Sequence, residues 1–171
     1  MILLIAGPSH TGKTALAHRL MRREGIPYLS IDHLKMGLIR SGQTHLTPCD
    51  DDETLTAYLW PILREIIKTA IENDQSLIIE GCYIPFHWQE SFEKAYLSHI
   101  RAVWLVMTQR YFREHGEDIR RWASVVENRG ADEKLDLEAL REENAWVQKR
   151  CRAQGCEVIL IDGAYEVDVE L

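Results

Sequence analysis

The sequence predicts an α/β protein with a mainly parallel sheet. Along its 171 residues, short apolar runs alternate with longer stretches that carry apolar residues at helical spacing. The apolar runs are continuous rather than alternating, as expected for strands that helices cover on both faces. With 46% hydrophobic and 27% charged residues, a chain of this length is expected to form one domain over residues 1–171.

The apolar runs place five strands, and they are expected at Ile2–Ala6, Tyr28–Ile31, Leu77–Ile79, Ala102–Met107 and Glu157–Ile161. Between them, helical spacing and end signals predict helices at Lys13–Arg23, His33–Arg40, Thr54–Asn73, Gln109–Asn128 and Asp136–Ala153. Pro61 is expected to kink the third of these helices or to restart it near Trp60, because proline removes a backbone donor. The acidic run Asp50–Glu53 is expected at that helix's N-terminus, where carboxylates meet the positive end of the dipole.

Charge and composition narrow the function classes. The net charge of −7 disfavours general nucleic-acid binding, which depends on Lys and Arg at phosphates. Residues 1–48 nevertheless hold six Lys/Arg and two Asp/Glu, so this third could attract a compact anion such as a nucleotide. No apolar run approaches the roughly 18 residues of a membrane span, and Met1–Ala6 is too short for a signal peptide. A cytoplasmic protein that does not associate with membranes is expected, with Cys49, Cys82, Cys151 and Cys156 as free thiols.

A phosphate-binding motif follows the first predicted strand. Residues 7–14 read GPSHTGKT and match the pattern GxxxxGK[ST], directly after a buried strand and at the start of an amphipathic helix. In this arrangement backbone N–H groups and the helix N-terminus surround phosphate oxygens. Ser9 stands where a dinucleotide-binding loop needs its second glycine, which excludes that class. The expected nucleotide-binding residues are Gly7, Pro8, Ser9, His10, Thr11, Gly12, Lys13, Thr14 and Ala15.

Two residues of the motif have specific expected roles. Lys13 should reach the β- and γ-phosphates, and the Thr14 hydroxyl should ligate Mg²⁺. The loop itself does not choose between ATP and GTP.

Carboxylates follow the second and third predicted strands. Asp32 stands where an open α/β sheet presents its ligand crevice, so it could accept the proton of an attacking hydroxyl. The alternative, which is compatible with the first role, is that Asp32 caps the helix His33–Arg40. Glu80 ends the third strand at a Walker-B-like position, where it could support Mg²⁺ or hold a substrate group. Gly81 would let a substrate approach the backbone closely.

Basic side chains are expected to complete the site. Five arginines lie between residues 110 and 129, and Arg113, Arg120 and Arg121 could close over the nucleotide and stabilise transferring charge. The alternative is a surface helix with pairs to Glu114, Glu117 and Asp118 at spacings of three and four residues. Lys35 and Arg40 could hold an acceptor's carboxylate or phosphate, or could be surface charges.

With these residues in place, the chain resembles the small P-loop kinases of the nucleoside-monophosphate-kinase type. That resemblance implies a P-loop NTPase three-layer sandwich, with a five-stranded parallel sheet in the order 2-3-1-4-5. It also implies an acceptor-binding helical region at residues 33–75 and a helical lid at residues 109–130. Tyr28–Leu38, Ile78–Gly81 and Val126–Arg129 are similar to bacterial sequences described as 2-phosphoglycerate-kinase-like or adenylate-kinase-like. More distantly, the position of Asp32 resembles zeta toxins and chloramphenicol phosphotransferases, in which an Asp after strand two serves as base and the acceptor is a hydroxyl.

The resulting prediction is an Mg²⁺–ATP-dependent kinase that moves the γ-phosphoryl group of ATP to a small hydroxylated or phosphorylated metabolite. ATP and Mg²⁺ are the expected cofactors, and the acceptor is the expected partner. Two alternatives stay open at this point. One is a regulatory or toxin-type nucleotide-binding protein with low turnover, and the other is a kinase for nucleic-acid ends, which the net charge disfavours. The sequence names neither the acceptor nor the oligomeric state.

Overall fold

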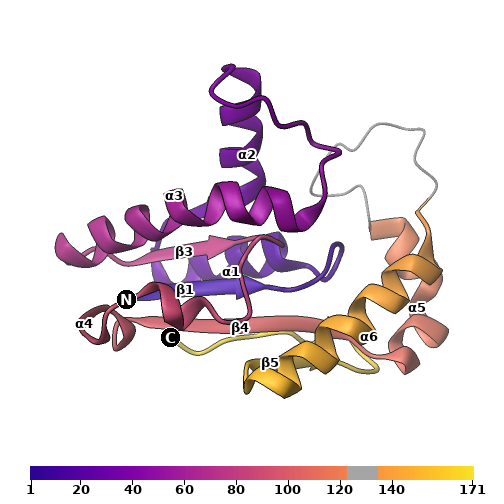
Figure 1. Ribbon diagram of the computed structural model, residues 1–171. Coiled ribbons are helices and arrows are strands. Elements are labelled where there is room, and N and C mark those ends of the chain that lie inside the picture. The colour runs from indigo at the N-terminus through magenta and orange to yellow at the C-terminus, as the bar shows by residue number, and fades with distance from the viewer. Residues whose placement is uncertain (123–134) are drawn as a thin grey trace.

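The computed structural model describes residues 1–122 and 135–171, and its centre is a five-stranded parallel sheet (Figure 1). The strands run in the order β2-β3-β1-β4-β5, which confirms the predicted topology. Their bounds are Ile2–Ala6 for β1, Tyr28–Ser30 for β2, Leu77–Glu80 for β3, Ile100–Met107 for β4 and Glu157–Ile161 for β5.

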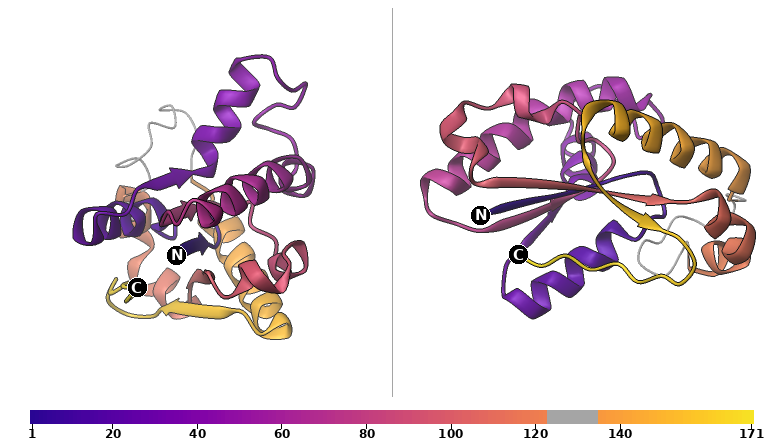
Figure 2. Two further views of the ribbon diagram at one scale, coloured as in Figure 1. Left: turned by 90° about the vertical axis from the view of Figure 1, so that its left-hand side faces the viewer. Right: turned by 90° about the horizontal axis from the view of Figure 1, so that it is seen from below.

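Helices cover both faces of the sheet, as the continuous apolar strands predict (Figure 2). Helices α3 (Asp52–Glu72) and α6 (Leu137–Gln154) pack on one face, against the side chains of Ile2, Leu4 and Ala6 of β1. Helices α1 (Lys13–Glu24) and α5 (Gln109–Trp122) contribute side chains to the core on the other face, which also contains Leu3 and Ile5. The alternation along β1 therefore builds two separate cores from one buried strand.

The remaining elements join the layers at their edges. Helix α2 (Ile31–Arg40) follows β2 without a loop and stands away from the sheet (Figure 1). A short 3-10 helix, η1 (Trp88–Ser91), and a single-turn helix, α4 (Lys94–Leu97), connect β3 to β4 and were not predicted. None of the helices in residues 1–122 and 135–171 combines the length and the apolarity that a membrane crossing requires.

Helix α2 begins earlier than predicted. Ile31 was assigned to the second strand, but it is the first residue of the helix and lies fully buried. Ser30 occupies the N-cap position, so the alternative that Asp32 caps the helix is wrong; Asp32 lies within the first turn. Burial of Ile31 under the sheet edge accounts for the immediate turn from strand to helix.

Helix α3 is also continuous where an interruption was expected. It runs from Asp52 to Glu72 through Pro61, so the predicted restart near Trp60 is wrong. Pro61 and Ala57, whose carbonyl loses its helical donor, both lie on the exposed side of the helix, where water can serve that carbonyl. The buried residues on either side of Pro61 hold the two halves on the sheet; they are Leu55, Leu59, Leu63 and Ile67.

The acidic run before α3 lies at the helix N-terminus, as predicted. Asp51 is the N-cap residue, and its carboxylate accepts a hydrogen bond from the Thr54 N–H at 2.8 Å. This bond and the one from the Thr54 hydroxyl lower the pKa of Asp51. Asp52 and Glu53 fill the first turn.

A buried asparagine fixes α6 to the carboxyl end of β4. The Asn144 side chain is fully buried; its Oδ1 accepts the Met107 N–H at 2.8 Å, and its Nδ2 donates to the Leu140 carbonyl at 2.8 Å. The amide therefore satisfies a strand donor that the end of the sheet leaves open.

We expect Asn144→Ala to lower the free energy of unfolding by about 1–3 kcal/mol, because the Met107 N–H stays buried without an acceptor. Urea denaturation measures the loss. Asn73→Ala is the matched control: Asn73 also donates to a helical carbonyl, that of Thr69, but it is exposed, so the expected change is below about 0.5 kcal/mol. Equal losses in the two variants would contradict the role given to Asn144.

Candidate functional site

The predicted phosphate loop connects β1 to α1 at the carboxyl edge of the sheet. Gly7 has a φ of 136°, and a Cβ at this position would lie 2.3 Å from the Leu105 carbonyl oxygen of β4. The loop thus crosses β4 too closely for any side chain at residue 7. Gly12 is the N-cap residue of α1, so the free N–H groups of that helix begin at the end of the loop.

Side chains of the motif hold the loop in a closed curl. The Thr11 hydroxyl donates to the Pro8 carbonyl at 2.9 Å, and Lys13 Nζ donates to the same oxygen at 2.6 Å. Lys13 is only 7% exposed, so its ammonium lies within the loop rather than in solvent. This is the position from which it could bind phosphate oxygens.

Glu80 lies at the end of β3 against the first turn of α1. The Thr14 hydroxyl donates to Glu80 Oε2 at 3.2 Å, and the residue is only 2% exposed. Burial raises the pKa of Glu80, although the Ser30 hydroxyl, the Lys13 charge and the Thr14 hydroxyl all oppose the rise. The carboxylate predicted at the Walker-B-like position is therefore brought together with Lys13 and Thr14.

The other Glu80 oxygen tests whether Mg²⁺ fits this site. Oε1 is buried and has no hydrogen-bond partner, which is costly for a carboxylate unless a ligand satisfies it. Mg²⁺ takes oxygen ligands and at nucleotide sites is held by one or two protein groups, with water and phosphate oxygens as the rest. The Thr14 hydroxyl and the Glu80 carboxylate fit that donor set.

Asp32 and Lys35 lie together in the first turns of α2. Lys35 Nζ is 2.6 Å from Asp32 Oδ1 and donates to the Tyr83 hydroxyl at 2.8 Å. Burial lowers the pKa of Lys35, but the bonds to Asp32 and Tyr83 outweigh it, and the pKa lies above its ordinary value. Arg40 is exposed in the last turn of α2, about 12 Å along the helix from Asp32, so the structure separates it from this pair.

Gly81 lies directly after Glu80 and faces α2. A Cβ here would lie 2.8 Å from the Ile31 Cβ, so the close approach at this glycine is with the protein's own helix. Contact with a substrate backbone stays a prediction.

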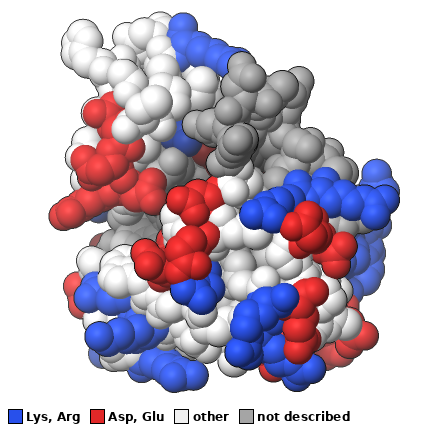
Figure 3. All heavy atoms as spheres, turned by 90° about the vertical axis from the view of Figure 1, so that its right-hand side faces the viewer, with Lys and Arg blue, Asp and Glu red and all other residues white. Residues whose placement is uncertain are grey.

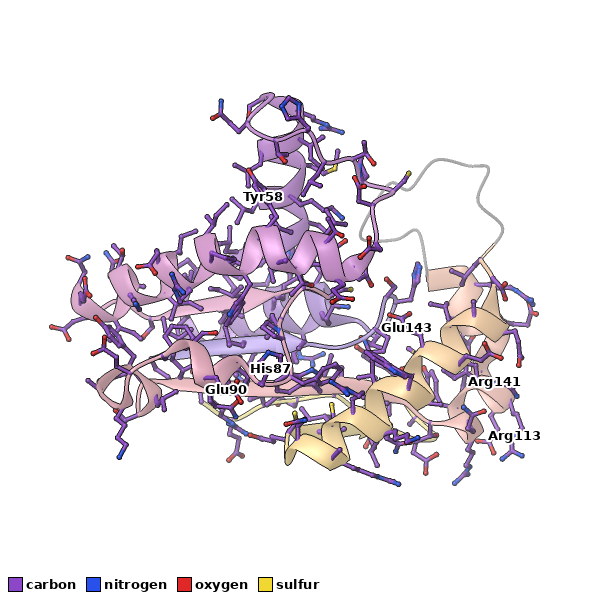
Figure 4. The ribbon with its side chains drawn as sticks, viewed as in Figure 1. Tyr58, His87, Glu90, Arg113, Arg141 and Glu143 are labelled. Atoms are coloured by element: carbon purple, nitrogen blue, oxygen red, sulfur yellow. The ribbon has the colours of Figure 1, made fainter. Side chains whose placement is uncertain are left out.

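In the described part of α5, Arg110 and Arg120 form the ion pairs at spacings of three and four residues that the alternative of a surface helix predicts. Arg110 pairs with Glu114 at 2.9 Å and Arg120 with Glu117 at 2.5 Å, and acidic and basic groups are interspersed on this face (Figure 3). Arg113 projects away from the phosphate loop (Figure 4), and Arg121 is exposed. The predicted lid at 109–130 includes residues 123–130, among them Arg129, which lie outside the described residues. Roles for Arg113, Arg120 and Arg121 stay predictions.

Two residues that the sequence analysis missed also reach the loop. Glu143 of α6 lies near it (Figure 4); burial raises the pKa of its carboxyl, against the Lys13 charge and a hydrogen bond from the Ser9 backbone. Its position three residues after the buried Leu140, on the helix face that also carries Val147 and Cys151, was the available signal. Tyr165 donates to the Thr11 carbonyl at 3.0 Å, and burial raises its pKa to about 12. Nothing in the local sequence predicts that contact.

Comparison with solved structures agrees with this architecture. A gluconokinase from Sinorhizobium meliloti 1021 superposes with a TM-score of 0.52 and 11% identity, covering 95% of this chain and 83% of that one. A protein provisionally assigned as a kinase, from Chloroflexus aurantiacus j-10-fl, gives a TM-score of 0.50 and 18% identity, with 94% and 87% covered. No protein-family model matches the sequence, and no curated protein matches it significantly. At these identities the likeness establishes the fold, and the chain has the α/β fold of P-loop kinases.

The burial of Glu80 predicts a pH-dependent stability. Its pKa in the folded protein lies above the unfolded value of about 4.5, so the folded state holds the proton more tightly than the unfolded chain. Stability is therefore lost as the pH rises from about 4.5 through the folded pKa. The Glu80→Gln variant lacks this titration. Without Mg²⁺, the difference between its free energy of unfolding and that of the wild type should therefore shift in favour of the variant as the pH rises through this range. Above this range the difference should stay constant. Urea denaturation from about pH 4 to about pH 8 measures the difference. If the free energies of unfolding of the two proteins changed with pH in the same way, burial would not raise the pKa of Glu80 in the folded protein.

Proposed function

We propose that this protein is an Mg²⁺–ATP-dependent kinase that transfers the γ-phosphoryl group to a hydroxyl of a small metabolite. The observation that carries the proposal is the order of groups along the carboxyl edge of the sheet: phosphate loop, Glu80, then Asp32. A nucleotide hydrolase or a nucleotide-dependent switch needs only the phosphate loop and Glu80. The carboxylate of Asp32, paired with Lys35 beyond Glu80, is an additional group that could bind and deprotonate an acceptor substrate.

Strand register supports this order. Glu80 is paired with Ile5 of β1 on one side and with Ser30 of β2 on the other. Neighbouring strands lie about 4.8 Å apart, so the strand that leads into the phosphate loop and the strand that leads into Asp32 lie about 10 Å apart, with Glu80 between them. A triphosphate tail bound in the loop would therefore point its end along the edge toward α2.

The chain's own groups can then perform the transfer. Lys13 and the loop N–H groups bind the β- and γ-phosphates, while Thr14 and Glu80 hold Mg²⁺, whose charge offsets that of the phosphates. Asp32 accepts the proton of the acceptor hydroxyl as its oxygen forms the new bond to the γ-phosphorus. The bond between that phosphorus and the oxygen bridging it to the β-phosphate breaks, and ADP leaves. Lys35 keeps Asp32 oriented through the contact of 2.6 Å between Nζ and Oδ1.

The folds of the gluconokinase and of the provisionally assigned kinase are consistent with this class of reaction. We extend the proposal to the regions around the site: residues 33–75 bind the acceptor, and residues 109–130 supply positive charge to the nucleotide. Phosphorylated acceptors and a cytoplasmic location belong to the same proposal. Suitable acceptor pools are sugar acids, amino-sugars, nucleosides and their monophosphates, and phosphoglycerates.

We expect Lys13→Ala to reduce γ-phosphoryl transfer from labelled ATP by about 100-fold or more, because a charge at the phosphates is lost. The fold should persist, since Thr11 still donates to the Pro8 carbonyl that Lys13 contacts. Lys94→Ala, at an exposed position of α4, is the matched control and should retain wild-type transfer. Wild-type activity in Lys13→Ala would refute the proposed site.

Asp32→Asn separates catalysis from binding. Asparagine keeps the shape and an oxygen for Lys35 but cannot take a proton, so the transfer rate should fall about 100-fold. The affinity for ATP, measured by equilibrium binding, should change by less than about threefold. Equal losses in rate and affinity would assign Asp32 to nucleotide binding or to structure instead.

A further inference from the structure

Tyr83 brings the loop after β3 into contact with the Asp32–Lys35 pair. The Tyr83 hydroxyl accepts a hydrogen bond from Lys35 Nζ at 2.8 Å, and the same nitrogen lies 2.6 Å from Asp32 Oδ1. The contact joins segments 48 residues apart in sequence. Tyr83 is 7% exposed and belongs to the core cluster that includes the buried residues of α3, while its hydroxyl contacts Lys35 of α2.

We propose that Tyr83 is a positioning residue of the acceptor site: its hydroxyl holds the Lys35 ammonium against Asp32 and so fixes the carboxylate that receives the acceptor's proton. The inference rests on the proposed function, which gives Asp32 that role.

The chemistry of lysine explains why a second anchor matters. A lysine side chain is long and flexible, and an exposed pair to a carboxylate three residues away contributes little. The Lys35 side chain is 11% exposed, so its charge lies in an environment where unpaired N–H groups are costly. Asp32 and Tyr83 bind two of the three N–H donors of the ammonium, and the third donor is left for an oxygen of the acceptor substrate.

The surroundings of the ammonium agree with this role. The charged and titratable groups that face it are Asp32 from α2 and Tyr83 from the loop after β3, with Cys82 beside the tyrosine. Burial raises the pKa of Tyr83, so its hydroxyl stays neutral and accepts through a lone pair. The bonds to Asp32 and Tyr83 raise the pKa of Lys35 above the value that its burial would otherwise set, so it stays charged.

The test is Tyr83→Phe, which keeps the ring and removes one acceptor. We expect kcat to fall about 10- to 100-fold with the KM for ATP unchanged, as for the loss of a hydrogen bond to a charged group. The alkaline limb of the pH–rate profile should move to lower pH, because Lys35 loses its proton more easily without the hydroxyl. An unchanged kcat and an unchanged profile would overturn the proposal.

Tyr96→Phe is a closely matched control. The Tyr96 hydroxyl is bonded to a charged group, Glu72, at 2.6 Å, and the ring lies 5.6 Å from an ammonium, that of Lys68. It lies on α4, in the connection that precedes β4, and has no contact with the Asp32–Lys35 pair. Wild-type kcat and pH–rate profile are expected; a loss like that of Tyr83→Phe would mean that any such hydroxyl affects turnover through stability.

A second variant shows whether Tyr83 acts through Lys35. Lys35→Gln should lower kcat at least as much as Tyr83→Phe, and the double variant should be no slower than Lys35→Gln. Multiplied losses in the double variant would overturn the proposal. Circular dichroism would show whether Tyr83→Phe folds. If it does not, Lys35→Gln with Tyr83 intact still tests the proposal: a wild-type kcat in Lys35→Gln would exclude that Tyr83 positions Asp32 through Lys35.

An NMR titration separates this inference from the proposed function. The signal of the Lys35 side chain, assigned by its loss in Lys35→Gln, should titrate at lower pH in Tyr83→Phe than in the wild type. If the wild type phosphorylates none of the acceptor pools but the titration shifts, the kinase proposal fails while the Tyr83 contact holds. An unshifted titration overturns the positioning role whatever the activity.

Discussion

The hydrogen bond from the Thr14 hydroxyl to the Glu80 carboxylate ties the first turn of α1 to the end of β3, inside the sheet's buried edge. A carboxylate that is 2% exposed destabilises the fold unless its oxygens are satisfied, and here one oxygen has Thr14 while the other has no protein partner. The cost is understandable if the carboxylate is kept for a ligand. A cation and a phosphate chain at this point would satisfy it, and they would also use the inward-facing Lys13.

The sheet converts this local arrangement into a directional site. All strands are parallel, so their carboxyl ends lie at one edge, and the order β2-β3-β1 puts Glu80 between the phosphate loop and Asp32. Helix α2 begins at once after β2 because Ile31 is buried under the edge, and this brings Asp32 and Lys35 into its first turns. The donor side and the acceptor side of the proposed reaction are thus held by the ends of β1 and β2, which flank the end of β3, rather than by long loops.

Sequence reasoning succeeded where local pattern controls structure. Continuous apolar strands predicted the parallel sheet, and the glycines and Lys13 of the phosphate loop predicted its position between strand and helix. It failed where packing overrides local preference: α3 continues through Pro61 because buried leucines on both sides hold it to the sheet. Contacts between distant segments had no local signal either, which is why Tyr83 and Tyr165 were missed. For the α5 arginines the sequence left two interpretations open; Arg120 has a partner within its own helix, and its role toward the nucleotide stays a prediction.

The most direct test of the account is a crystal structure with Mg²⁺ and a non-hydrolysable ATP analogue. We predict the phosphates in the loop of residues 7–14, with Mg²⁺ bound to the Thr14 hydroxyl and linked to Glu80 Oε1 directly or through one water. The γ-phosphate should point toward Asp32 on α2. A nucleotide bound elsewhere, or bound in the loop with its γ-phosphate turned away from α2, would contradict the proposed transfer between these two strand ends.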